Sequence, residues 1–371
     1  MNTASVNPLM PGSGALRVGF LSYPMLYQRT GGLQIQILET MKALRALGVQ
    51  AHLIDPNTEA LSDYDLIHVF SAINGNHRLL ETARSLGCKV VLSPLIRPSW
   101  TRWTGWRDSL LDRIVGRLSG WHLQTSYAQI LSALTHADKI VALGEIERAS
   151  IQAAFAIPAE RIVVIENGVT QRFFDATPEA FQRRWGIQGK FVLNVAAINA
   201  HKNQLALVRA LEGQDVPIVL IGECLSEDAA YLAKLTASPN VRYLGRLAYD
   251  DAALCSAYAA ATVFALPSES EVMPLSVMEA LAAGTPAVMT DCHSMRLPRA
   301  GAAVKEHSPS DIARLRTLLL ETLAHPSAAA DCKGAVEQLR WSSVAERLLA
   351  VYHDVLGEQE RRPAKLPRRA G

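Results

Sequence analysis

The sequence predicts an α/β protein with two domains, each built on a doubly wound parallel sheet. Short apolar runs typical of buried strands recur along the chain, and helical patterns lie between several of them. Strands that alternate with helices form parallel sheets through right-handed crossovers. The length of 371 residues exceeds a single hydrophobic core and suggests two domains of roughly 150–200 residues each.

The first half of the chain contains the clearest predicted helix, at residues 33–47. Its apolar residues keep a period of 3.6, and Gly48 follows as a stop signal. We predict strands in this half at residues 16–22, 50–55, 65–70, 89–93, 139–143 and 161–165.

The second half repeats the alternation, with strands predicted at residues 191–196, 217–221, 241–244, 262–266 and 287–290. A linker is expected at about 167–175, where Asn167-Gly168 supplies a turn. The expected organisation is a flexible N-terminus (1–14), a first domain (15–168), a second domain (169–356) and a basic, disordered tail (357–371).

The composition excludes several classes of protein. A net charge of +2 gives no overall field that would attract nucleic acid. The five cysteines form no C-x-x-C pair, so we expect reduced thiols in a cytoplasmic protein. Arg17 interrupts the first hydrophobic run, which argues against a signal peptide, and no apolar stretch approaches the length of a membrane span.

Residues 267–288 carry the most informative motif, in which Glu271 and Glu279 stand eight positions apart. The pattern is strand, loop, helix, strand, with Pro274 suited to the first helical position and Gly284 to the stop. Ligands of parallel sheets bind outside the carboxyl ends of the strands, where Glu271 is expected. Glu279 is an isolated charge on an apolar helix, so it must face water or a polar ligand.

This motif resembles the donor-binding motif of retaining glycosyltransferases of family 4 (group 1), which have the GT-B fold of two Rossmann-like domains facing across a cleft. The resemblance covers about residues 15–355, and Val272-Met273-Pro274 replaces the family's Gly-Phe-Gly. The matching positions are Pro267, Ser268, Glu271, Leu275, Glu279, Ala280, Gly284 and Pro286.

The resemblance implies two catalytic residues and a set of donor-binding positions. Glu271 would bind donor sugar hydroxyls, and Lys202 would take charge that develops on the departing diphosphate; Ala197 stands where the family has an arginine. Glu279 would hold the ribose hydroxyls. The remaining donor-binding positions are Val272, Met273, Leu275, Gly31, Gly32 and Gly245.

Gly31 and Gly32 follow the first predicted strand and resemble the family's Gly-Gly loop, where a helix N-terminus can hold an anion. A tight turn is the alternative. Asn167-Gly168-Val169, followed by Phe173, is similar to the family's interdomain hinge.

We assign no catalytic histidine. Many relatives place one near the donor sugar, but here that position is Leu95. His68 and His136 are the other candidates, and a histidine beside an apolar strand is more often structural.

We also predict no metal or cofactor. Asp63-Tyr64-Asp65 resembles the metal-binding Asp-x-Asp of another glycosyltransferase fold, but it precedes its strand and is better read as a turn. Gly12-Ser13-Gly14 likewise precedes a strand, which rules it out as a dinucleotide-binding loop.

Residues 97–121 are unusually rich in tryptophan and arginine, a combination that suits a membrane interface. A helix is expected from Asp108 to Leu118, with an apolar face and with Arg113 and Arg117 off it. An insertion packed on its own domain is the alternative. The tail could add attraction to anionic lipid through Arg361, Arg362, Lys365, Arg368 and Arg369.

The function expected from the resemblance is transfer of a hexose from a nucleoside-diphosphate sugar to a glycan or lipid-linked glycan in cell-surface polysaccharide biosynthesis. Two alternatives stay open: another nucleotide-sugar enzyme of the same fold, such as a phosphorylase or epimerase, or a weakly active homologue that binds a glycan or partner. The expected location is the cytoplasm, with peripheral attachment to the inner face of the plasma membrane.

Overall fold

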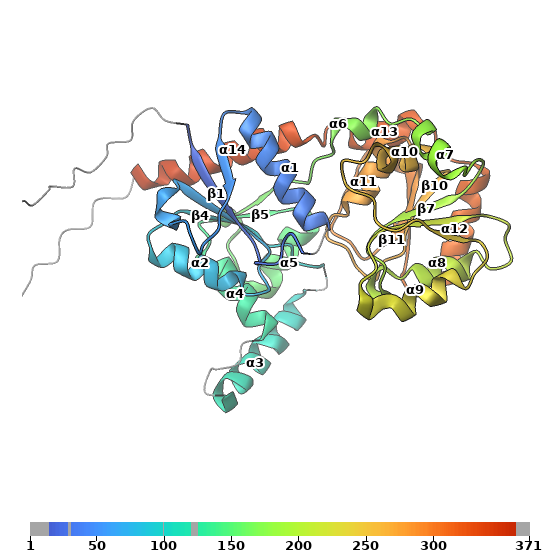
Figure 1. Ribbon diagram of the computed structural model, residues 1–371. Helices are drawn as coiled ribbons and strands as arrows, with labels where there is room; N and C mark the ends of the chain where they lie inside the picture. The colour runs from blue at the N-terminus through green and yellow to red at the C-terminus, as the bar shows by residue number, and fades with distance from the viewer. Residues whose placement is uncertain (1–14, 29–30, 99, 120–124, 361–371) are drawn as a thin grey trace, which may run out of the picture.

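The computed structural model describes residues 15–28, 31–98, 100–119 and 125–360, and contains two six-stranded sheets side by side (Figure 1). The strand orders are β2-β1-β3-β4-β5-β6 and β12-β11-β10-β7-β8-β9, and neighbouring strands pair in parallel. The predicted α/β class with two doubly wound parallel sheets is therefore confirmed.

The strands follow the predicted apolar runs closely. In the first sheet they are β1 (Arg17–Leu21), β2 (Gln50–Leu53), β3 (Leu66–Phe70), β4 (Val90–Ser93), β5 (Lys139–Ala142) and β6 (Ile162–Val164). In the second they are β7 (Val192–Val195), β8 (Ile218–Ile221), β9 (Val241–Tyr243), β10 (Val263–Leu266), β11 (Ala287–Thr290) and β12 (Val304–His307). Strand β12 was not predicted, because an edge strand that includes Lys305 and Glu306 lacks a buried apolar run.

The helices lie on both faces of each sheet (Figure 1). Those that follow the strands of the first sheet are α1 (Gly32–Ala46), α2 (Asn76–Ser85), α3 (Arg102–Ser119), α4 (Ser126–His136) and α5 (Glu145–Phe155). The rest are α6 (Gln171–Phe174), α7 (Glu179–Trp185), α8 (Gln204–Ala210), α9 (Ala229–Thr236), α10 (Ala252–Ala260), α11 (Leu275–Ala282), α12 (Ile312–Ala324), α13 (Ala329–Val336) and α14 (Trp341–Glu360). The helix predicted at 33–47 is α1.

Helix α14 returns from the second domain and packs against α1 of the first (Figure 1). Tyr352 is fully buried there, and its hydroxyl lies 2.7 Å from Nδ1 of His68 in β3. Assigning residues 341–356 to the second domain was therefore wrong, because the apolar face of α14 is buried on the first sheet. The helix also continues to Glu360, past the expected start of the tail. Residues 1–14 and 361–371 lie outside the described residues.

The chain passes between the domains at two adjacent places. The backbone N–H of Val169 donates to the carbonyl of Leu339 at 2.7 Å, and Val169 forms a bridge with Arg340. A Cβ on Gly168 would lie 2.5 Å from the backbone nitrogen of Trp341, so a glycine is needed where the two crossings touch. The predicted Asn-Gly-Val segment is thus one half of a two-stranded connection.

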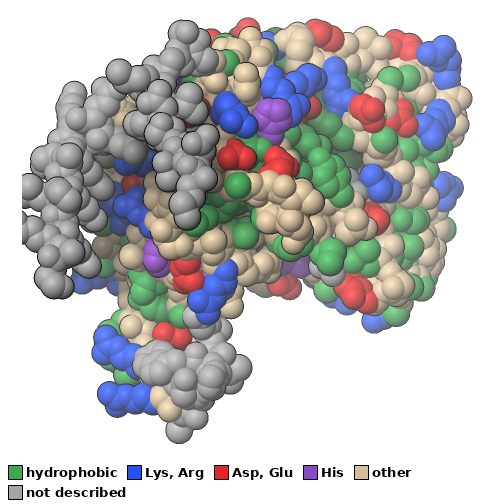
Figure 2. Space-filling view, turned by 60° about the vertical axis from the view of Figure 1, so that its left-hand side comes forward, with side chains coloured by type: hydrophobic (Ala, Val, Ile, Leu, Met, Phe, Trp, Pro, Cys, Tyr) green, Lys and Arg blue, Asp and Glu red, His purple; other side chains and the backbone are tan. Residues whose placement is uncertain are grey.

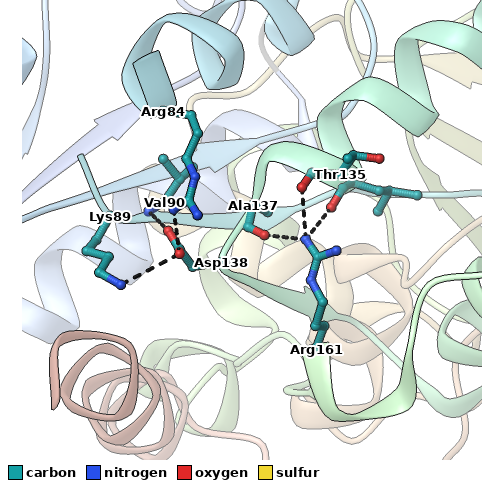
Figure 3. A network of polar contacts seen from close by, with 8 residues as sticks. Arg84, Lys89, Val90, Thr135, Ala137, Asp138 and Arg161 are labelled. Carbon is teal, nitrogen blue, oxygen red and sulfur yellow. Dashed lines mark hydrogen bonds and ion pairs between the residues drawn. The ribbon is translucent and has the colours of Figure 1, made fainter. Parts of the chain in front are cut away.

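A network of charged side chains lies at the amino ends of β4, β5 and β6 (Figure 3). The carboxylate of Asp138 accepts the backbone N–H of Val90 at 2.9 Å and pairs with Arg84 at 2.6 Å and Lys89 at 3.7 Å. Beside it, the guanidinium of Arg161 donates to the carbonyls at the end of α4, namely those of Leu134, Thr135 and Ala137. The charged groups at the amino ends of these strands are thus paired with one another or with backbone groups. Ligands of parallel sheets bind at the opposite, carboxyl ends of the strands.

Candidate functional site

A cavity of about 390 Å³ lies between the carboxyl ends of the two sheets. This volume is within the range of small-molecule sites, which is about 300–1,000 Å³. The first domain lines it with residues that follow β1, β4 and β5: Gly31, Gly32, Leu33, Ile35, Gln36, Leu95 and Leu143. The second domain lines it with residues at or after the ends of β7, β8, β9 and β10, which include Ala197, Lys202, Gly222, Arg246, Glu271 and Glu279.

Two helices begin at this cavity from opposite walls, α1 from the first domain and α11 from the second. A Cβ on Gly31 would meet nothing within 4 Å, so the space in front of α1 is open. Helix α11 begins at Leu275, one residue later than predicted, with Pro274 as its N-cap, and Gly284 ends it with a φ of +90°. The unpaired N–H groups and dipoles of both helix starts favour an anionic ligand between them.

The two predicted catalytic residues meet in an ion pair. The ammonium of Lys202 lies 2.6 Å from Oε1 of Glu271, and the two side chains are 24% and 11% exposed. The Asn199 side chain accepts the backbone N–H of Lys202 at 3.1 Å, and the N–H of Glu271 donates to the Cys292 carbonyl at 2.9 Å. Both groups are therefore held in place, and a diphosphate would compete with Glu271 for the ammonium.

Glu279 is 5% exposed, although it is the acid that was expected to face water or a ligand. Its Oε2 accepts the Tyr258 hydroxyl at 2.8 Å, while its Oε1 has no hydrogen-bond partner within the described residues. Burial raises the pKa of Glu279 to about 7, and the hydrogen bond from Tyr258 and the charge of Arg172 oppose that rise. A buried carboxylate oxygen without a partner, at the wall of a cavity, is available to a ligand hydroxyl.

The residues in place of the family's Gly-Phe-Gly also line the cavity. Within the described chain, the backbone N–H groups of Val272 and Met273 donate to no protein acceptor, so a ligand could use them. The Val272 carbonyl accepts from Ser294 at 2.9 Å. The Met273 sulfur accepts the N–H of Asn167 at 3.2 Å, which joins this loop to the interdomain connection.

Gly245 does not line the cavity, unlike the other predicted site residues. Its φ of +73° favours glycine, and its carbonyl accepts the N–H of Gly222 at 2.9 Å. This bond joins the loops that follow β8 and β9, and the next two residues, Arg246 and Leu247, reach the cavity. Gly245 therefore stabilises the loop that carries Arg246 and Leu247 and does not itself line the cavity.

Several cavity residues were missed by the sequence analysis: Asn167, Glu223, Arg246, Tyr249 and Tyr258. Arg246 could have been found, because it follows closely on a strand end. The tyrosines could not, since α10 and the preceding loop give no local sign of where they point. Ala197, which stands where the family has an arginine, lines the cavity, and Arg246 lines it as well.

We expect Arg246→Ala to weaken nucleoside-diphosphate binding about tenfold. A charged hydrogen bond to phosphate is worth about 1.5–3 kcal/mol, and the lower end of this range applies because Arg246 is exposed. Isothermal titration would measure this. Arg242→Ala is the matched control, since Arg242 is also exposed but donates to the Pro239 carbonyl. Equal affinity of the two variants would remove Arg246 from the site.

On the first-domain wall, the buried Glu147 holds two loops. Its carboxylate accepts the N–H of Ile96 at 2.6 Å and of Leu143 at 2.7 Å. Burial raises the pKa of Glu147 to about 7, and these two N–H groups oppose the rise. Glu147 thereby fixes the backbone beside Leu95, which has a φ of +57° and occupies the position of the family's histidine.

The two candidate histidines, His68 and His136, lie away from the cavity. His68 is fully buried between Tyr352 and Ser93, and burial lowers its pKa to about 3. His136 is bonded to Ser132 within α4. Neither lines the cavity, which agrees with their interpretation as structural residues.

The rejected metal motif lies at the far end of the first sheet. Asp65, just before β3, accepts the N–H of Arg17, the first residue of β1, at 2.8 Å, so the interpretation as a turn holds. Among the described residues, no group of three or more His, Cys, Asp or Glu side chains is arranged to hold a metal ion. Gly12-Ser13-Gly14 lies outside the described residues.

Comparison with known proteins found similar sequences and structures. A model described as "Glycosyl transferases group 1" matches residues 183–322. A phosphatidyl-myo-inositol mannosyltransferase of Mycobacterium leprae is 24% identical over 92% of this chain and 97% of its own length. An O-antigen chain mannosyltransferase B of Escherichia coli is 26% identical over 59% of this chain and 61% of its own. The crystal structure of Anabaena HepE in complex with UDP has a TM-score of 0.70 at 16% identity, covering 91% of this chain and 100% of that one.

Proposed function

The chain belongs to the group 1 glycosyltransferases (family 4, GT-B fold), which transfer a sugar from a nucleotide sugar, and we propose that it moves a hexose, with retention of configuration, to a glycan or lipid-linked glycan. Two relatives, a phosphatidyl-myo-inositol mannosyltransferase and an O-antigen chain mannosyltransferase, support acceptors of this kind by their names. We propose a role in cell-surface polysaccharide biosynthesis.

In this proposal the donor lies across the cavity. Lys202 and the start of α1 face the diphosphate, and Glu271 binds sugar hydroxyls with help from the N–H groups of Val272 and Met273. Glu279 binds the ribose through Oε1. The observation that carries the proposal is the convergence of the Lys202–Glu271 pair and this buried, unpartnered oxygen on one interdomain cavity.

Retention follows from attack on the same face of the sugar that the diphosphate leaves, with a phosphate oxygen as the base. This route needs no protein nucleophile, and none was identified in the motif. The anomeric configuration of the first product, read by NMR, tests this step.

A thermal-shift screen of UDP, GDP and ADP tests donor binding and identifies the base. A ligand at 100 times its Kd stabilises the folded protein by about 2.7 kcal/mol. A shift with one nucleotide, followed by hydrolysis of the matching sugar donor, would support the proposal. No shift with any of them would favour a homologue that binds a glycan or partner without catalysis.

We expect transfer to survive EDTA, because a lysine and two helix N-termini can take the diphosphate charge without a divalent ion. Initial rates with and without EDTA should agree within about twofold. Loss of activity that only Mn²⁺ or Mg²⁺ restores would contradict this prediction.

We propose that the enzyme works in the cytoplasm, at the inner face of the plasma membrane. All five cysteines are unpaired, as in proteins of reducing compartments. Within the described part of the chain, no helix combines the length and hydrophobicity needed to cross a bilayer.

A further inference from the structure

Helix α3 projects from the first domain (Figure 1). It carries a row of exposed hydrophobic side chains. Trp103 and Trp106 are 66% and 60% exposed, and their rings stack with centroids 5.2 Å apart. Leu110 and Ile114 follow at 46% and 47% exposure. Spacings of three and four residues place side chains on one side of a helix, so these four form a continuous strip, here called the outer face of α3.

The opposite side attaches α3 to the domain. A Cβ on Gly105 would lie 2.4 Å from the carbonyl oxygen of Ala154 in α5, so the two helices pack closely there. The Asp112 carboxylate accepts the hydroxyl of Thr125 at 2.8 Å. Gly105 and Asp112 are seven residues apart and share a side, which is turned away from Trp103. The outer face therefore points away from the protein body.

The tryptophans of segment 97–121 divide into two kinds. Trp100 packs on Tyr127 and Phe155, with ring centroids 6.2 and 5.1 Å away, and anchors the base of the projection. Trp103 and Trp106 remain in solvent, and Trp121 lies outside the described residues. The alternative of a packed insertion thus holds for Trp100 and fails for the outer face.

The exposed charge around this strip is positive. Arg102, Arg113 and Arg117 are exposed, and Arg107 pairs with Asp108 at 2.8 Å. The helix has four arginines and two aspartates, and Asp112 faces the domain. In Figure 2, basic and hydrophobic side chains are visible along the left edge of the projection at the lower left.

We propose that the outer face of α3 docks on an anionic phospholipid surface. Indole rings take positions at headgroup depth, and the flanking guanidinium groups pair with lipid phosphates. The strip from Trp103 to Ile114 is about 17 Å long and about 10–12 Å wide, so it offers roughly 200 Å², below the about 800 Å² per partner of a stable protein interface. A membrane needs no such area or shape complementarity, which favours lipid over a protein partner.

Docking would bring the cavity near the membrane. Leu95 lines the cavity and α3 begins at Arg102, so the segment between them spans at most about 25 Å. An acceptor held in the docked membrane would therefore be near the first-domain wall of the cavity. This last step rests on the proposed function, whereas the docking itself does not.

Co-sedimentation of the full chain with vesicles tests the docking. We expect binding to phosphatidylcholine vesicles that contain phosphatidylglycerol, weaker binding without it, and a decrease as NaCl screens the arginines. Trp103→Ala/Trp106→Ala should weaken binding about tenfold or more. Leu47→Ala/Leu86→Ala is the matched control, because these leucines are 40% and 58% exposed outside α3 and should not matter.

Further measurements distinguish docking through the outer face of α3 from vesicle binding by another part of the protein. Brominated lipids should quench the tryptophan fluorescence of the wild type and quench the double variant less. Arg102→Gln/Arg113→Gln, which leaves the strip intact, should lower binding roughly fivefold per arginine. Donor hydrolysis without vesicles should be nearly unchanged in every variant, so a failure of docking is distinguishable from a failure of the proposed function.

Two results would overturn the proposal. One is vesicle binding by the tryptophan variant equal to that of the wild type. The other is a lipid-free dimer, seen by sedimentation velocity, that the tryptophan substitutions dissociate, since the outer face would then be an interface between copies of this chain.

Discussion

Lys202→Ala is expected to slow sugar transfer about 10²- to 10³-fold, the usual cost of removing one group that stabilises charge in a transition state. The ammonium lies at the cavity wall 2.6 Å from Glu271 and is ready to take the charge of the departing diphosphate. Glu271→Gln should also lose activity, because an amide holds the sugar hydroxyls less strongly than a carboxylate. Initial rates at saturating donor measure both effects.

The effect of losing the ion pair on the stability of the fold must be distinguished from its effect on catalysis. Removing one partner of a partly buried pair leaves an uncompensated charge and destabilises the fold. In Lys202→Met/Glu271→Gln both charges are gone, so the Tm should recover while activity does not. Lys305→Ala is the matched control, because Lys305 pairs with Glu321 at 3.4 Å elsewhere in the same domain. Recovery of activity together with Tm would contradict a catalytic role.

Donor affinity is expected to fall about tenfold between pH 8 and pH 6. Burial raises the pKa of Glu279 to about 7, and the proposed ribose contact uses the ionised form. At pH 8 most of the carboxyl is ionised, whereas one unit below the pKa only about a tenth is, so affinity declines as pH falls through 7. Titration of the nucleoside diphosphate at a series of pH values measures this dependence.

Glu279→Gln should bind the nucleotide about ten- to hundredfold more weakly at pH 8, a cost of about 1.5–3 kcal/mol, and should show little pH dependence. Glu321→Gln is the control, because Glu321 is exposed, pairs with Lys305 and does not line the cavity, so its substitution should change neither the affinity nor its pH dependence. A glutamine at 279 that leaves affinity and its pH dependence unchanged would rule out the ribose contact.

The local sequence predicted features that depend on neighbours along the chain. Buried strands such as β8 and β10 appear as short apolar runs, because a strand covered on both faces excludes polar side chains. Gly284 and Pro274 marked the ends of α11 to within one residue, since caps are local backbone geometry. The resemblance added Glu271, Glu279 and Lys202, all of which line one cavity.

Other features were settled by contacts between distant residues. The return of α14 to the first domain depends on Tyr352 reaching His68, 284 positions away, and no local pattern records that contact. The hydrogen bond from Tyr258 to Glu279 and the position of Arg246 at the cavity likewise join separate loops.

By itself, the sequence determined the fold class and most strand positions, because periodicity and capping act over a few residues, and its resemblance to the family singled out the two acids of residues 267–288. Only the tertiary structure decided that Glu271 is paired with Lys202, that Glu279 is buried with one free oxygen, and that two of the tryptophans in segment 97–121 are exposed on α3 while Trp100 is packed. Burial and pairing depend on how the elements pack together, and that packing sets the charge and exposure of each side chain.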